Sequence, residues 1–171
     1  DGAVREYREA LSDDPSDYRA RFNLAATLEE IAGVRDAAAK VARSERRTDD
    51  AAAAAEAARA ARDEARRHYE RILADRPTDV RASCNLAALL FDMADAGEDP
   101  EAEATAFALL DRCASASSGD ALPARARASR HFRRNELDLA EKEALRALAA
   151  ESADPETHFL LGEIALRRGD C

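Results

Sequence analysis

The amino-acid sequence predicts an all-α protein built from repeated helix-turn-helix units. The chain has 171 residues with only 6 Gly and 5 Pro, and 36% of its residues are charged. Ala, Glu, Arg and Leu are abundant, which favours helix and leaves few turn residues for a sheet. Residues 5–15 and 68–77 also share a Tyr, a following Leu and a closing Pro, and each segment precedes a helix that contains Asn-Leu-Ala. Such self-similarity is typical of helical arrays.

Local signals for helix starts and ends divide the chain into eight expected helices. The triplet Asp-Pro-Glu occurs at 99–101 and 154–156, and it offers an N-cap carboxylate, a proline at the first helical position and an acid in the first turn. Ser16 and Thr78 are expected caps, and Ser-Ser-Gly at 117–119 is expected to end a helix. The predicted helices cover 2–12, 16–46, 50–75, 78–95, 100–115, 121–134, 136–150 and 155–168.

A frame of 34 residues brings the repeats into register. With Pro155 as the first position, Leu161, Gly162 and Ala165 fall at the seventh, eighth and eleventh positions. Small residues are expected where the two helices of a unit cross closely, and the frame places them at the eighth position (Ala25, Ala87, Ala128) and the twentieth (Ala65, Ala106, Ala140). In this spacing the sequence resembles the tetratricopeptide repeat (TPR) family.

The resemblance implies a TPR-like alpha-alpha superhelix, a right-handed solenoid of antiparallel helix pairs, with residues 1–171 forming a single array. The expected parts are the second helix of a preceding repeat (2–15), a repeat with a 28-residue insertion at 34–61 (18–79), a repeat with a seven-residue insertion (80–120), a repeat of 34 residues (121–154) and the first helix of a further repeat (155–171). We expect the chain to be a section of a longer protein, because it begins without Met and both end repeats are incomplete.

The insertion at 34–61 is rich in alanine and lacks a stripe of bulky apolar residues. Its helix propensity is high. The favoured interpretation is a solvated helical hairpin that projects from the array. A partly disordered loop and a dedicated partner-binding arm are the two alternatives.

The helix expected at 121–134 departs from the apolar pattern at two positions. Arg127 and His131 occupy the seventh and eleventh positions of their unit, and a buried Arg is costly unless it is paired. We therefore expect weak packing of this helix. Either the helix is partly exposed, or the long side-chain stems cover apolar surface while the charged heads reach water.

Cys113 is expected to be buried and unreactive, and Cys84 is expected to be reachable from the concave side.

Composition and motifs argue against several function classes. A net charge of -9 disfavours a nucleic-acid-binding domain, which needs a basic surface. No apolar run approaches the ~20 residues that span a bilayer, so no membrane insertion is expected. Three widely spaced cysteines suggest neither a disulfide framework nor a metal site, and a cytoplasmic location is expected. No catalytic motif, cofactor-binding loop or metal-ligand spacing is present, which predicts a protein that is not an enzyme and needs no cofactor.

The TPR resemblance implies that the first helix of each unit lines a concave groove. The positions that meet a partner in that family carry over to Arg19, Phe22, Asn23, Arg81, Asn85, Arg125, Ser129 and Arg133. Asn can bond a peptide backbone and Arg can hold a carboxylate through two parallel bonds, which favours an acidic partner segment.

The expected function is a protein-protein interaction scaffold that binds a partner peptide or helix in this groove. One alternative is a regulatory or substrate-recruiting segment of a larger enzyme. The other is a structural spacer in a multiprotein assembly. The expected partners are a protein or peptide and, in addition, neighbouring repeats or domains of the same chain.

Overall fold

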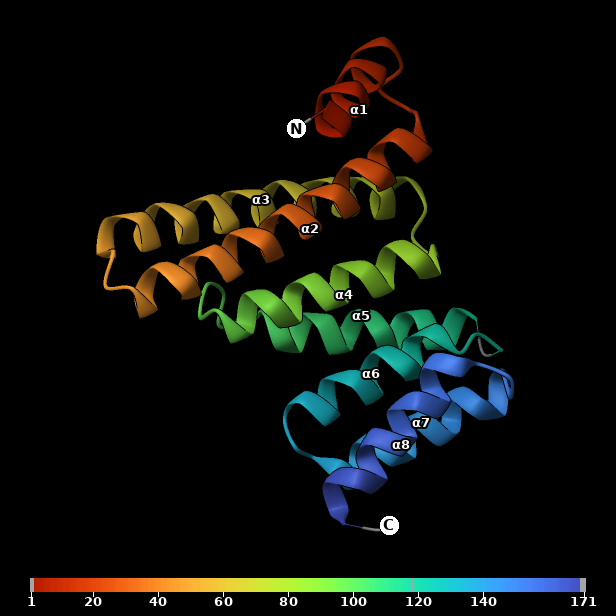
Figure 1. Cartoon of the computed structure of the whole chain (residues 1–171). Helices are drawn as coiled ribbons and strands as arrows, with labels where there is room; N and C mark the ends of the chain where they lie inside the picture. Colours follow the sequence, from red (N-terminus) through yellow and green to blue (C-terminus); the bar gives the residue numbers. More distant parts are fainter. Residues whose placement is uncertain (1, 118, 170–171) are drawn as a thin grey trace. The chain divides into compact units, whose positions relative to one another are not determined.

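The computed structural model describes residues 2–117 and 119–169, and their secondary structure consists of helices joined by short connections (Figure 1). The helices are α1 (Gly2–Asp13), α2 (Tyr18–Ser44), α3 (Thr48–Asp75), α4 (Val80–Asp95), α5 (Ala102–Ala116), α6 (Leu122–Arg133), α7 (Leu137–Ala150) and α8 (Pro155–Arg168). The all-α prediction is confirmed for the described residues. The right-handed superhelix stays a prediction.

Aspartate side chains cap three of the helix starts. Asp17 accepts a hydrogen bond from the backbone N–H of Ala20 at 3.0 Å, and Asp79 accepts one from Ala82 at 2.9 Å. Asp154 caps α8 as predicted, through the N–H of Glu156 at 3.3 Å. The expected caps Ser16 and Thr78 are therefore wrong by one residue each, because the carboxylate that follows is the stronger acceptor.

The prediction that the Asp-Pro-Glu triplet at 99–101 starts a helix is wrong. α5 begins at Ala102, and Glu101 makes no side-chain cap. Asp99 instead accepts a hydrogen bond from Nη1 of Arg66 at 2.9 Å. The predicted end at 117–119 falls at Ala116, where Ser117 donates its N–H to the carbonyl of Cys113; Ser118 lies outside the described residues.

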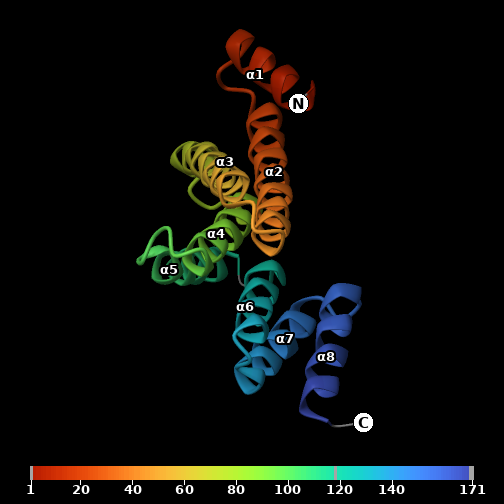
Figure 2. The same cartoon turned by 60° about the vertical axis from the view of Figure 1, so that its left-hand side comes forward.

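The described residues form two compact units. The first runs to Pro77 and includes Asp92–Asp99, and the second comprises Thr78–Phe91 and the residues from Pro100 onward. In the first unit, α2 and α3 form a long antiparallel hairpin, and α1 packs against α2 (Figure 2). The core of the hairpin centres on Leu24, Leu28, Tyr69 and Ile72, which are all buried.

The insertion at 34–61 forms the far part of this hairpin. α2 continues to Ser44, the chain turns at Arg46 with a φ of 59°, and α3 begins at Thr48. Ala39 and Ala42 of α2 and Ala51 and Ala58 of α3 are buried. A stripe of methyl groups lets two helices approach closely, so alanine supplies the contact that bulky residues supply elsewhere. The structure therefore has the helical hairpin.

In the second unit, α5, α6, α7 and α8 pack in succession, and α6 also contacts α8. Phe91 of α4 meets Phe107 of α5 edge to face, with ring centroids 5.1 Å apart. The six alanines placed at the eighth and twentieth positions of the 34-residue frame, in both units, are fully buried. Gly162, at the eighth position of α8, is exposed.

Candidate partner-binding groove

Three helices of the second unit line a cavity of about 230 Å³. Its walls come from α4, α6 and α8, which are the first helices of their repeats in the 34-residue frame. The lining residues are Cys84, Asn85, Leu122, Arg125, Ala126, Ser129, Glu156 and Leu160. Asn85, Arg125 and Ser129 belong to the predicted partner-binding set, so the structure brings three of those eight residues to one cavity.

Arg125 is held by two carboxylates at the edge of this cavity. Its Nη1 lies 3.1 Å from Oδ1 and 3.2 Å from Oδ2 of Asp154, and 2.8 Å from a carboxylate oxygen of Glu156. The hydroxyl of Thr157 and the guanidinium of Arg125 hold the pKa of Asp154 below its usual range. Because two acidic groups surround one cation, Arg125 does not make this cavity attractive to an acidic segment. The carboxylate-holding role predicted for it is not supported.

Cys84 is less reachable than predicted. Only 8% of the Cys84 surface is exposed, and burial raises the pKa of its thiol to about 12. The thiolate is the reactive form, so the burial of Cys84 disfavours reaction of its thiol although the residue lines the cavity. Cys113 is buried as predicted, and burial also raises the pKa of its thiol.

The other predicted residues have different environments. Phe22 is a core residue, since it is 8% exposed and meets Tyr69 edge to face with centroids 5.8 Å apart. The prediction that Phe22 contacts a partner is therefore wrong. Arg19 and Asn23 are exposed on α2 of the first unit, and Arg81 and Arg133 are exposed in the second unit.

The buried arginines of α6 are paired. Arg127 is bonded to Asp111 and lies 3.8 Å from Glu143, while Arg130 donates to Glu103 at 3.0 Å and covers the Phe91 ring at 5.0 Å. The bond from Arg130 lowers the pKa of Glu103. The expected weak packing of α6 is wrong, because Ala128 is fully buried and both guanidinium groups meet carboxylates.

His131 is also partnered in α6. Its Nδ1 lies 2.7 Å from a carboxylate oxygen of Glu136, and its ring lies 5.5 Å from that of Phe107. The contacts of Arg127, Arg130 and His131 hold α6 beside the cavity. The sequence does not predict the role of Arg130, because no local signal distinguishes it from an exposed arginine.

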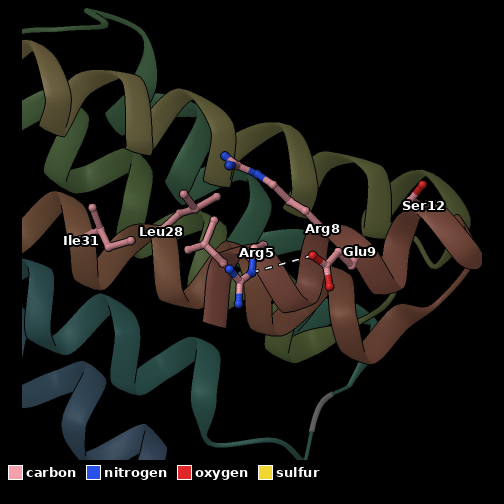
Figure 3. Close-up of a pocket in the computed structure, with 7 residues that line it drawn as sticks. Arg5, Arg8, Glu9, Ser12, Leu28 and Ile31 are labelled. Carbon is pink, nitrogen blue, oxygen red and sulfur yellow. Dashed lines mark ion pairs between the residues drawn. The ribbon is translucent and has the colours of Figure 1, made fainter. Parts of the chain in front are cut away.

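Two further cavities lie in the first unit. α1 and α2 line an open cavity of about 580 Å³ that includes Val4, Leu28 and Ile31, and Arg5 lies 3.8 Å from Glu9 at this cavity (Figure 3). The insertion borders the other cavity, of about 650 Å³, which includes Asp36, Lys40 and Arg43 of α2.

The wall of the larger cavity contains a buried ion cluster. Arg62 of α3 donates to Glu98 through Nε at 2.9 Å and through Nη2, and to Asp36 at 2.6 Å. Only 4% of the Arg62 side chain and 12% of the Glu98 side chain are exposed, whereas 42% of the Asp36 side chain is exposed, so the Arg62–Glu98 pair is the buried part of the cluster. The cluster joins the insertion to the segment that follows α4.

The described residues contain no group of three His, Cys, Asp or Glu side chains able to hold a metal ion. Within the same residues, no helix combines the length and apolar character required to cross a bilayer. The chain matches no known family model and no curated protein sequence.

Proposed function

We propose that this chain is a protein-interaction scaffold of the TPR type, without enzymatic activity, and that it binds a peptide or helix of a partner protein. The supporting observation is the cavity between α4, α6 and α8. Its lining residues fall at the second, fifth, sixth and ninth positions of three successive units, which are the positions that the TPR resemblance assigns to a concave groove. A cytoplasmic location is part of the same proposal.

The chemistry of the cavity indicates how a segment would bind. Leu122, Ala126 and Leu160 provide an apolar surface, and about 230 Å³ accommodates one medium-sized side chain. Asn85 carries an amide that can pair with a peptide backbone, and Ser129 carries an exposed hydroxyl. A small apolar pocket with a few polar groups is typical of a specificity pocket.

The charges near the cavity refine the choice of partner. Arg125 is already paired, so a segment that enters the cavity needs no carboxylate of its own. We therefore propose a partner segment that enters the cavity through an apolar anchor residue.

Selection from a library of displayed random peptides tests this function. Peptides that bind the wild-type chain are expected to lose about tenfold or more in affinity, measured by fluorescence anisotropy, when Ser129→Trp fills the cavity. The matched control is Ser115→Trp, which places the same indole on an exposed position of α5. Failure to select any peptide, or equal binding by the Ser129→Trp variant, would overturn the proposal.

A further inference from the structure

A further cavity of the first unit brings three arginines together. It has a volume of about 330 Å³ and lies between the first turn of α2 and the last turns of α3. Arg21 of α2, Arg71 of α3 and Arg76 directly after α3 line it, and Asp75 is the acidic residue of the lining. The lining therefore has a net charge of +2 on a chain whose net charge is -9. Such a concave positive site attracts an anion.

Arg76 is held at this cavity by a stack of aromatic rings. Its guanidinium carbon lies 4.3 Å from the centroid of the Tyr18 ring. Tyr18 in turn stacks on the buried Phe22, with ring centroids 5.9 Å apart and an angle of 29° between the planes. A guanidinium that covers a ring with its face keeps N–H donors at its edge. Because the stack already orders Arg76, less entropy is lost when an anion binds.

The other two arginines make contacts that leave them able to bind an anion. Arg21 donates through Nη2 to the carbonyl of Pro15, and this bond uses one of the five N–H donors of its guanidinium. Nε of Arg71 lies 3.3 Å from a carboxylate oxygen of Asp75, with 62% and 57% of the two side chains exposed. An ion pair as exposed as this one is weak. Arg71 can therefore exchange Asp75 for a more highly charged anion.

The fold does not require this arginine cluster. In the 34-residue frame, the place of Arg71 is held by Arg112 in α5 and by Arg146 in α7. The places of Arg21 and Arg76 are held by other residue types, namely Ser83 and Ser117 in the next repeat, and Ala124 and Glu151 in the one after. Two helix pairs thus form with a single arginine at this end, so the cluster is a property of the α2/α3 pair alone.

We propose that this cavity binds a phosphate monoester group carried by a phosphorylated residue of a partner protein. A phosphate monoester has a charge of about −1.5 to −2 at pH 7 and three strong acceptor oxygens, which match three guanidinium groups and a net charge of +2. A carboxylate has one charge and two oxygens, so it satisfies fewer of the donors. Arg71 and Arg76 are exposed, so a side chain of another protein can reach the site.

The phosphate site is separate from the partner-binding groove. It belongs to the first unit, whereas the residues of the groove belong to the second. The inference therefore does not rest on the proposed function, and a chain that failed to bind peptides in the groove would still be expected to bind phosphate here.

Nuclear magnetic resonance of the ¹⁵N-labelled 171-residue chain tests the site. Titration with N-acetyl-phosphoserine amide is expected to shift the Nε–H signals of Arg21, Arg71 and Arg76 until they saturate. N-acetyl-serine amide, which lacks the phosphate, is expected to shift none of them. Acetate is expected to bind about tenfold or more weakly than the phosphoserine derivative. Adenosine monophosphate carries the same group on a nucleoside, so it distinguishes a nucleotide site from one for a phosphorylated residue.

Substitutions in the cavity sharpen the measurement. Arg21→Gln and Arg76→Gln are each expected to weaken binding of the phosphoserine derivative by about tenfold or more, because each removes a charged donor. Asp75→Asn removes the internal competitor for Arg71 and is expected to strengthen binding by about threefold, a gain that a damaged fold would not give. The matched control is Arg112→Gln, an exposed position of α5, which should bind as the wild type does. Thermal melts check the fold of every variant.

Four results would overturn the site. One is the absence of saturable shifts with the phosphoserine derivative. Another is unchanged affinity in Arg76→Gln, and a third is weaker binding in Asp75→Asn at an unchanged melting temperature. The fourth is binding of adenosine monophosphate without binding of the phosphoserine derivative, which would assign the cavity to a nucleotide.

Discussion

Glu29 is a carboxyl group whose protonation is coupled to folding. It lies on α2 and accepts the hydroxyl hydrogen of the fully buried Tyr69 at 2.8 Å. Burial raises the pKa of Glu29 to about 7, opposed by the Tyr69 bond and assisted by the charges of Asp92 and Glu30. In the unfolded chain this pKa is near 4.5. The folded state therefore binds the proton more tightly than the unfolded state does.

This coupling predicts that Glu29 makes the protein more stable in mild acid. The contribution is complete below the unfolded pKa and is lost as the pH rises through about 7. Between about pH 5 and pH 8 the free energy of unfolding is expected to fall by about 2 kcal/mol on account of this group. Urea unfolding of the wild type and of Glu29→Gln measures it, since Gln cannot titrate. Equal pH dependence in both proteins would contradict the assignment.

Ala87 marks a helix crossing with no room for a larger side chain. It is fully buried in α4, at the eighth position of its repeat. Ala87→Leu is expected to cost about 1 to 3 kcal/mol through overpacking. The neighbouring Ala88 is exposed on the same helix, so Ala88→Leu is the matched control and should be nearly neutral. A thermal melt in which both variants unfold at the wild-type temperature would refute the register.

The environments of the candidate site residues were only partly predictable from the sequence. The burial of Ala87 and Cys113 follows from spacing alone, since small residues at fixed intervals must face a neighbouring helix. The pairing of Arg125 with Asp154 does not follow, because these residues are 29 positions apart and no local pattern joins them. The burial of Phe22, which the resemblance places in the partner-binding groove, does not follow either, for a related reason: its contact, Tyr69, lies beyond the insertion in the sequence.

At the scale of elements, the helices themselves were largely predictable. The range 155–168 is confirmed for α8, and 78–95 differs from α4 by two residues at its start. Proline, Gly and capping residues act within a few positions, so their signals can be read locally. The hairpin at 34–61 could be distinguished from its alternatives only with the structure, because an alanine-rich sequence has high helix propensity whether or not it packs. Its buried alanines show that it packs.

The ion pairs of Arg62 predict how the insertion is held against the segment that follows α4. Arg62 bonds Asp36 on α2 and Glu98 after α4, and its side chain is almost fully buried. Arg62→Ala removes the partner of Glu98, whose side chain is only 12% exposed, so the substitution is expected to cost about 3 kcal/mol. Hydrogen exchange should become faster in residues 34–44, measured by mass spectrometry. Arg59→Ala, an exposed position of the same helix, is the control. Unchanged exchange in the Arg62 variant would show that the cluster does not hold the insertion.

At the scale of the whole molecule, the two units share one helix. α4 contributes residues up to Phe91 to the second unit and the residues from Asp92 to the first. In helical arrays, stability is approximately a sum of local terms and nearest-neighbour terms. Arg62 and its partners belong to the first unit, and Ala87 belongs to the second, so the two sites share no bonded partner.

Additivity of the two substitutions is therefore expected. The combined variant Arg62→Ala with Ala87→Leu should lose the sum of the two single losses within about 0.5 kcal/mol, because sites without shared partners act independently. Urea unfolding of the wild type, both single variants and the double variant gives the four free energies. The slope of each transition reports whether the whole chain unfolds in one step. A double variant that loses much less than the sum, at unchanged slope, would mean that α4 already transmits the first perturbation to the second site.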